Sequence, residues 1–276
     1  MGYLFSIWGV RGSMSVSGDA YSGYGSHTTC FSLNTPDGLI VIDAGTGITS
    51  LFTKPHKELP LPPITLLFTH FHLDHVIGLP VFLPLYNPKA QITVMADASR
   101  PDPWRQTLST IMAAPFWPVP LPQCGAQLTF LDLPPQRSMT LYGIRISWIP
   151  IWHPQQCLSF RFDTPKGSIV VATDREHGQP EMDAAFLAFC RDADALIYDA
   201  QYTPDEYPSH HGWGHSTWLE GVDVAKRAGV KELILTHHDR ERTDAQEDAL
   251  IAEAQHCFPN TGGAREGQRI EFTTRI

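Results

Sequence analysis

Short apolar runs, separated by glycine, proline and aspartate, recur along the whole chain. Runs of about four to eight residues rich in β-branched and aromatic side chains predict β-strands. Apolar residues spaced by three and four predict helices in the second half. The predicted strands are 3–9, 30–34, 39–43, 64–69, 91–95, 127–131, 139–149, 157–162, 168–173, 195–199 and 232–236, and the predicted helices are 183–193, 216–229 and 243–258.

The order of these elements predicts the fold class. Strands dominate the first half, and helices alternate with strands in the second. Ser216 and Thr243 are candidate N-caps of the last two helices, and Gly229 is a candidate helix end. Because each sheet must bury an apolar face, this order predicts a layered α/β fold of two packed sheets with helices outside. No repeat or linker interrupts the 276 residues, so a single domain over 1–276 is expected.

Residues 96–125 depart from this pattern because they are rich in proline and aromatic side chains. Residues 103–113 fit a helix, but APFWPVPLP (114–122) cannot be an interior strand, since proline lacks the N–H donor. Long apolar loops often have a function or cover something. Two interpretations stay open: a surface loop packed on its own domain, or a lid or dimer contact. As a lid, Phe116 and Trp117 would contribute to substrate binding.

The charge of the chain restricts the kinds of partner it can bind, and its cysteine content indicates the redox state of its compartment. The net charge of −9 and the pI near 5.8 argue against a protein that grips long nucleic acid by its phosphates. No apolar run approaches the roughly 20 residues of a membrane helix, so no membrane partner is expected. The five cysteines are widely spaced, with no CxxC, which argues against a disulfide framework and a cysteine zinc site. We expect buried thiols and a reducing cytoplasm.

Three of the thirteen histidines fall within six residues, His70 to His75, directly after the predicted strand that ends at Thr69. Alternate residues of an extended segment share a face, so His70 and His72 should point the same way. Asp74 and His75 follow where a helical turn would begin. Imidazole and carboxylate suit zinc and neighbouring divalent ions, and burying this cluster without a ligand would be costly. The segment therefore predicts a site for two adjacent metal ions.

The segment HFHLDH (70–75) resembles the HxHxDH signature of the metallo-β-lactamase superfamily, in its ribonuclease Z-like branch. The motifs on either side of it, from LIVIDAGTG (39–47) upstream to ELILTHHDR (232–240) downstream, stand in the order that this family shows. The resemblance implies a four-layer αββα sandwich, in which Asp43 supports the metal-site loop. It also implies that His70, His72 and His153 bind one metal and that Asp74, His75 and His237 bind a second, with Asp174 bridging the two. His238 is the rival for the place of His237.

The same resemblance implies the cofactor and the nucleophile. The cofactors would be two divalent metal ions, with Zn²⁺ expected and Mn²⁺ or Fe²⁺ as alternatives, because selectivity depends on geometry and supply. Such ions lie about 3.5–4 Å apart and share a water whose pKa falls toward neutrality. The resulting hydroxide would be the nucleophile.

Two further motifs resemble the ribonuclease Z-like branch. In ALIYDAQY (195–202) and GWGHST (212–217), the resemblance makes Asp199 the residue that orients His215. His215 would then act on the phosphate or protonate the leaving oxygen, which completes a catalytic set with Asp74. The alternative for His215 is a capping or surface histidine ahead of the helix. His210 and His211 are interpreted as surface residues.

The substrate expected from this branch is a small anionic phosphodiester, most favourably a cyclic nucleotide, cleaved by a homodimer. Loops 9–18 and 24–30 resemble those of ribonuclease Z-like enzymes for small cyclic nucleotides, although His27 stands where relatives often carry asparagine. The chain lacks the glycine-rich, basic arm with which ribonuclease Z binds pre-tRNA. One competing function is a carbonyl hydrolase (lactonase, thioesterase or β-lactamase-like) at the same site, and another is a non-catalytic metal-binding or sensing protein.

Overall fold

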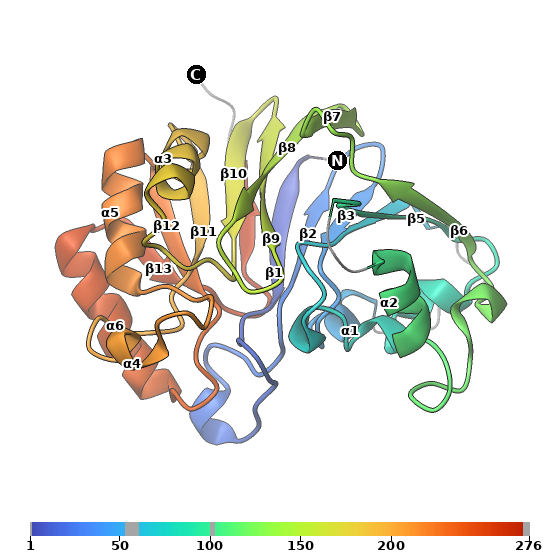
Figure 1. Ribbon diagram of the computed structural model, residues 1–276, viewed down its shortest axis with the longest axis horizontal. Helices are drawn as coiled ribbons and strands as arrows, with labels where there is room; N and C mark the ends of the chain where they lie inside the picture. Colours follow the sequence, from blue (N-terminus) through green and yellow to red (C-terminus); the bar gives the residue numbers. More distant parts are fainter. Residues whose placement is uncertain (1, 53–60, 100–102, 273–276) are drawn as a thin grey trace.

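Two mixed β-sheets face each other in the computed structural model, which describes residues 2–52, 61–99 and 103–272 (Figure 1). The first sheet has the order β14 (Arg269–Glu271), β1 (Leu4–Gly9), β2 (Cys30–Asn34), β3 (Leu39–Ile42), β4 (Ile64–Leu67), β5 (Gln91–Ala96), β6 (Gln127–Asp132). The second has the order β13 (Thr261–Gly263), β12 (Glu232–Thr236), β11 (Ala195–Asp199), β10 (Gly167–Ala172), β9 (Cys157–Thr164), β8 (Ile144–Ile151), β7 (Ser138–Leu141).

Helices cover the outer face of each sheet (Figure 1). Helices α1 (Ile48–Leu51) and α2 (Trp104–Ile111) pack on the first sheet, and α3 (Pro180–Phe189), α5 (Trp218–Ala228) and α6 (Asp244–Cys257) pack on the second. The short α4 (Tyr207–His210) precedes α5. A third apolar core, with Phe31 and Phe160 at 0% exposure, fills the space between the sheets. The predicted four-layer αββα sandwich is confirmed.

The parallel strands of each sheet decide where functional side chains can meet. Strands β3 to β6 run parallel in the first sheet, and β10 to β13 run parallel in the second. The carboxyl ends of parallel strands lie at one edge of a sheet, and ligands of α/β sheets bind outside those ends. The residues that follow β3, β4, β10, β11 and β12 are therefore brought together.

Three predicted element boundaries were wrong, each for a local reason. The run 139–149 is a hairpin, β7 and β8, because Tyr142 (φ 48°) and Gly143 (φ 73°) form a two-residue turn with both residues left-handed. The helix predicted at 183 begins at Pro180, a residue suited to a first helical turn, and ends at Phe189. Helix α5 is capped by Thr217 instead of Ser216.

Other local predictions fared better. Helix α2 lies within 103–113, and Thr243 caps α6 in a capping box with Gln246. Gly229 ends α5 in the left-handed conformation.

The expectation that all cysteines are buried was wrong for Cys257, which is exposed in the last turn of α6. The other four cysteines are buried and unpaired.

The segment 96–125 packs partly on its own domain, and its residues 100–102 lie outside the described part of the chain. Trp117 is half-buried and packs against the core under the first sheet, and its Nε1 donates to the Tyr86 hydroxyl at 2.9 Å. Phe116, beside it, is 70% exposed. Trp117 thus agrees with the interpretation of a surface loop packed on its own domain. Phe116 remains exposed for a lid or dimer contact.

Candidate metal centre and active site

The candidate ligands lie where strands end at the facing edges of both sheets. Asp174 follows β10 by two residues and His237 follows β12 directly, on parallel strands of the second sheet that are separated by β11. His70 follows β4 of the first sheet, and His75 closes a short 3₁₀ turn, Leu73–His75. His153 comes after β8. Each of these side chains is placed by the buried strand that precedes it.

The structure brings all seven predicted metal ligands together in two adjoining groups. His70, His72 and His153 form one group, and Asp74, His75, Asp174 and His237 form the other, with ligand atoms within 4.8 Å of one another in each. Asp174 lies between the groups. Its Oδ1 is 3.7 Å from His70 Nε2 and 3.3 Å from His237 Nε2, and its Oδ2 is 3.0 Å from His75 Nε2. This is the position that a bridging carboxylate would occupy.

Neighbouring residues orient the imidazole rings toward the centre of each group. The Nδ1 contacts are His70 with Thr69 Oγ1 (3.0 Å), His75 with Asp43 Oδ2 (2.8 Å), His153 with Gly214 O (2.7 Å) and His237 with Gln201 Oε1 (3.0 Å). His72 is turned the other way, because its Nε2 contacts Gln155 and its Nδ1 lies 2.9 Å from His153 Nε2. Such supporting contacts fix which nitrogen is free to bind a metal.

Several of the nitrogens left free are buried without a hydrogen-bond partner, and this tests whether the residues suit metal ions. The Nε2 atoms of His70, His75 and His237 are in this state. Buried polar atoms of native proteins are nearly always satisfied, so three unsatisfied nitrogens converging on carboxylates need a ligand. Two divalent cations would satisfy them and also balance the charge of Asp74 and Asp174. The donor set therefore fits a pair of divalent metal ions.

The electrostatics of the two groups differ. Burial lowers the pKa of His70 well below its usual value and that of His153 to about 4, so both imidazoles are neutral, as a metal ligand must be. Burial, the largest single cause, acts to lower the pKa of His75 and His237, but the carboxylates around them, Asp174 foremost, together outweigh it and raise both. A metal ion that replaces these protons would take over the same attraction to Asp174.

The backbone at the strand ends is held in an uncommon conformation. Asp43, Asp174 and His237 all have φ near 60° (60°, 58° and 61°), in the left-handed region that few non-glycine residues adopt. Residues in sparsely populated regions cluster at functional sites, where the surrounding structure must maintain them. In all three cases the turn comes directly after a buried strand or within two residues of it.

The N-terminal loop of residues 9–18 reaches the metal groups. The backbone N–H of Ser13 donates to Asp74 Oδ2 at 2.9 Å. Gly12 lies against His237, and a Cβ there would be 2.4 Å from the His237 Nδ1 atom. Only glycine allows this approach. His27 contacts Thr46 Oγ1 at 3.2 Å and belongs to none of the metal-ligand groups among the described residues.

Asp43 supports the site from below, in the position that the sequence predicted. Its carboxylate accepts hydrogen bonds from the N–H of Thr69 (2.8 Å), the hydroxyl of Thr69 (2.7 Å) and His75 Nδ1 (2.8 Å). It thereby ties the end of β4 to the ring that faces Asp174.

We expect Asp43→Asn to weaken binding of one metal about 10- to 100-fold, the usual effect of losing a group that orients a ligand. Asparagine has one acceptor oxygen where the carboxylate has two, so it cannot accept from both the Thr69 N–H and His75 Nδ1, and the imidazole would lose its fixed orientation. Competition with a chromophoric chelator measures the affinity. Asp37→Asn, at the exposed turn between β2 and β3, is the matched control and should bind both metals as the wild type does. Equal affinities in the two variants would contradict this role of Asp43.

His215 lies beside the metal groups and is held by Asp199. Its Nδ1 contacts Asp199 Oδ2 at 2.9 Å, and its ring stacks on His237 with centroids 4.8 Å apart. The Asp199 carboxylate also accepts from the N–H of Asp174 at 2.9 Å. One carboxylate thus fixes both His215 and the residue between the two groups. The structure does not support the alternative of a capping or surface histidine, since Thr217 is the cap and His215 is 8% exposed.

Three further histidines near these residues have other environments. His238 points away from the metal groups, because its Nδ1 lies 2.9 Å from Glu247 and its Nε2 contacts Ala264 O. His211 is exposed, as expected of a surface residue. His210 is half-buried and lines a cavity.

Sequence reasoning missed Glu176, the residue that shapes the loop bearing His215. Glu176 is 1% exposed, and its carboxylate accepts from the N–H groups of Gly212 (2.6 Å) and Gly214 (2.7 Å). The carbonyl of Gly214 in turn accepts from His153. Glu176 therefore connects the loop of His215 with a candidate metal ligand. Its position two residues after Asp174 was the only sequence signal.

Comparison with known proteins identifies the family. The beta-lactamase superfamily domain matches residues 39–238, which contain all seven candidate ligands. The chain belongs to the metallo-β-lactamase superfamily. The curated relatives that it matches include ribonuclease Z proteins. The fold and the cluster of histidine and aspartate together indicate that this member of the superfamily binds divalent metal.

Two curated relatives and one solved structure illustrate the similarity. The chain is 36% identical over 96 residues to ribonuclease Z of Geobacillus kaustophilus, a match that covers 35% of this chain and 30% of that protein. It is 24% identical over 282 residues to ribonuclease Z of Lachnospira eligens, covering 84% and 88%. The crystal structure of the metallo-beta-lactamase fold protein YhfI from Bacillus subtilis has a TM-score of 0.75 and 20% identity, covering 98% and 100%. That structure shows a shared fold.

The sequence matches to the first ribonuclease Z relatives are partial. The chain matches less than a third of the length of the first ribonuclease Z relatives. Among the described residues, no helix is long and apolar enough to cross a membrane.

Proposed function

We propose that this protein is a two-metal-dependent phosphodiesterase that hydrolyses a small phosphodiester, most favourably a cyclic nucleotide. The observation that carries the proposal is the contact between His215 and Asp199, directly beside the metal groups. Hydrolysis of a P–O ester needs a general acid near the leaving oxygen, and a histidine held by a carboxylate suits that role. A lactonase, thioesterase or β-lactamase does not require this pair.

The proposed ligands divide between the two groups, with Zn²⁺ proposed for both. His70, His72 and His153 would hold one ion, Asp74, His75 and His237 the other, and Asp174 both. When bound, such a pair supplies a water of lowered pKa and binds the phosphoryl oxygens. No serine or cysteine nucleophile is needed. The buried Cys157 is not one of the proposed ligands, although its Sγ atom lies 3.6 Å from His70 Nδ1.

The chain's own residues then handle the proton. Asp199 accepts from His215 Nδ1, so the Nε2 atom of His215 is the one that can give a proton to the leaving oxygen. Asp199 also stabilises the protonated imidazole by its charge. The same carboxylate holds the backbone of Asp174, so the proton donor and the metal groups keep a fixed separation. This fixed geometry is what positions the leaving oxygen for protonation.

The ribonuclease Z names of the relatives favour a second candidate, cleavage of RNA. These names stand against the expectation that the protein binds no long nucleic acid. The net charge of −9 favours the small substrate, because phosphate contacts of long RNA need clustered lysine and arginine.

A substrate panel tests the proposal. The metal-loaded protein is offered bis-p-nitrophenyl phosphate, 3′,5′- and 2′,3′-cyclic nucleotides, a pre-tRNA transcript and a lactone, each with zinc or manganese. We expect turnover of the phosphodiesters that stops on chelation and returns with metal. A protein that retains two metals and opens only the lactone would overturn the proposal, and turnover of the pre-tRNA alone would establish the second candidate.

A further inference from the structure

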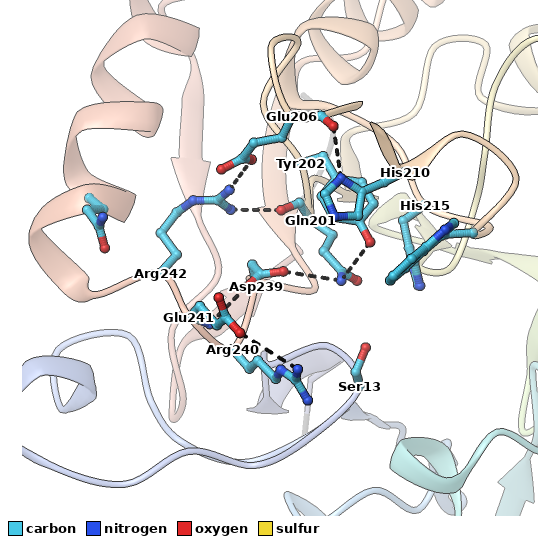
Figure 2. Close-up of a pocket in the computed structure, with 12 residues that line it drawn as sticks. Ser13, Gln201, Tyr202, Glu206, His210, His215, Asp239, Arg240, Glu241 and Arg242 are labelled. Carbon is cyan, nitrogen blue, oxygen red and sulfur yellow. Dashed lines mark hydrogen bonds and ion pairs between the residues drawn. The ribbon is translucent and has the colours of Figure 1, made fainter. Parts of the chain in front are cut away.

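A cavity of about 620 Å³ adjoins His215, which is one of its lining residues. Ser13, Gln201 and His215 are among the residues that line it (Figure 2). Residues of the segments 202–213 and 239–246 form the opposite walls. Ser13 binds Asp74, and Gln201 contacts His237, so this cavity begins where the proposed metal site ends. Its volume suits a group the size of a nucleoside.

One wall of the cavity is aromatic. The rings of Tyr202 and His210 stack with centroids 4.3 Å apart, and His210 meets Trp213 edge to face at 4.9 Å. Tyr202 is buried, whereas Trp213 is 61% exposed. A large aromatic side chain that borders a cavity and is left uncovered offers a face on which a planar ring can stack.

The main chain around Trp213 is already ordered. The residues on either side, Gly212 and Gly214, donate their N–H groups to the buried carboxylate of Glu176. Trp213 itself donates its backbone N–H to His210 O at 3.0 Å. A wall fixed in advance loses little conformational entropy when a ligand binds, and this raises affinity.

The charges of the cavity favour an uncharged ligand. Arg242 is neutralised, since it contacts Glu206 at 2.6 Å and donates to Gln201 O (Figure 2). Asp239, Arg240 and Glu241 remain on the facing wall, two acids against one base. Their carboxylates can accept hydrogen bonds from amino or hydroxyl groups, while a further phosphate would meet net negative charge.

We propose that this cavity binds the nucleoside part of the substrate, with its base stacked on Trp213, and that it excludes a second phosphate group by charge. The inference rests on the proposed phosphodiesterase activity and specifies its substrate: an ester of a single nucleoside, such as a nucleoside cyclic monophosphate. The nucleoside lies next to His215, the residue that would protonate its oxygen. A longer oligonucleotide is disfavoured at the wall of Asp239 and Glu241.

Free adenosine probes the stacking wall, as a competitive inhibitor of bis-p-nitrophenyl phosphate hydrolysis by the metal-loaded protein. Trp213→Leu should raise the inhibition constant of adenosine about 5- to 150-fold, the range for losing one stacked base, and Trp213→Phe should restore most of the affinity. Trp213 is largely exposed, so neither change should affect folding. Trp152→Leu, an exposed tryptophan outside this cavity, is the matched control and should leave the constant unchanged.

The charge of the cavity is tested with a dinucleoside monophosphate, adenylyl-adenosine, against the same compound carrying terminal phosphates. At low salt we expect kcat/KM to be about fivefold or more lower for the charged compound, and Glu241→Lys to narrow the gap, because a like charge nearby costs about 1 kcal/mol in water.

The outcomes separate the two proposals. If bis-p-nitrophenyl phosphate is not hydrolysed at all, the proposed function fails. If it is hydrolysed but adenosine does not compete, or competes equally well in Trp213→Leu, only the nucleoside assignment fails. A preference for the charged compound would overturn the exclusion of a second phosphate.

Discussion

Replacing Asp174 by asparagine is expected to lower phosphodiester hydrolysis at least about 10³-fold and to remove at least one equivalent of bound metal. Asp174 is 1% exposed and lies within 4 Å of His70, His75, His153 and His237. Together with Asp74, its negative charge would compensate the two divalent cations, and metals contribute several kcal/mol of transition-state stabilisation. A loss of about 4 kcal/mol corresponds to about 10³-fold in rate.

The choice of asparagine isolates the charge. The variant can keep the left-handed backbone (φ 58°) and the N–H bond to Asp199, because asparagine tolerates this conformation. Metal content by elemental analysis, kcat/KM and the thermal midpoint are measured together. Asp223→Asn, on the exposed face of α5, is the matched control and should retain both metals and activity. Full activity in Asp174→Asn with two metals bound would refute the bridging role.

His215→Ala should lower kcat/KM about 10²- to 10⁴-fold for an alkyl diester while leaving both metals bound. The ring contacts Asp199 and lies beside His237, but it belongs to neither group of proposed ligands. The deficit should depend on the leaving group. A p-nitrophenolate leaves without help from an acid, so the loss for a p-nitrophenyl diester should be much smaller than the loss for a 3′,5′-cyclic nucleotide.

The comparison of these two substrates separates proton donation from structural damage, because a distorted site would lose both activities alike. His211→Ala provides the control, since the His211 side chain is 70% exposed in the same loop. An equal loss on both substrates, or a loss of metal from His215→Ala, would show that His215 supports the site without donating the proton.

Much of the metal centre could be predicted because its residues lie close together in the sequence or follow buried strands. His70, His72, Asp74 and His75 stand within six positions, and the strand ahead of them is buried at every position of β4. Asp174 and His237 also come soon after apolar runs. Since parallel strands end at one edge, local hydrophobicity alone implies where these side chains meet.

The hairpin at Tyr142 and Gly143 and the start of α3 were harder to predict for a different reason. A glycine inside an apolar run fits a bulge as well as a turn, and only the pairing of β7 with β8 decides between them. The start of α3 at Pro180 likewise depends on where its apolar face packs against the second sheet.

The sequence by itself determined the layered fold, the order of the metal-binding motifs and the pairing of Asp199 with His215 through the resemblance to a family. Only the tertiary structure decided that Glu176 holds the loop of His215, and that His237 rather than His238 faces Asp174. It alone also formed the cavity beside Trp213. These features depend on contacts between residues far apart in the sequence, such as Glu176 with Gly212, which are separated by 36 positions. No local pattern encodes such contacts, because they form only when the strands have set the loops side by side.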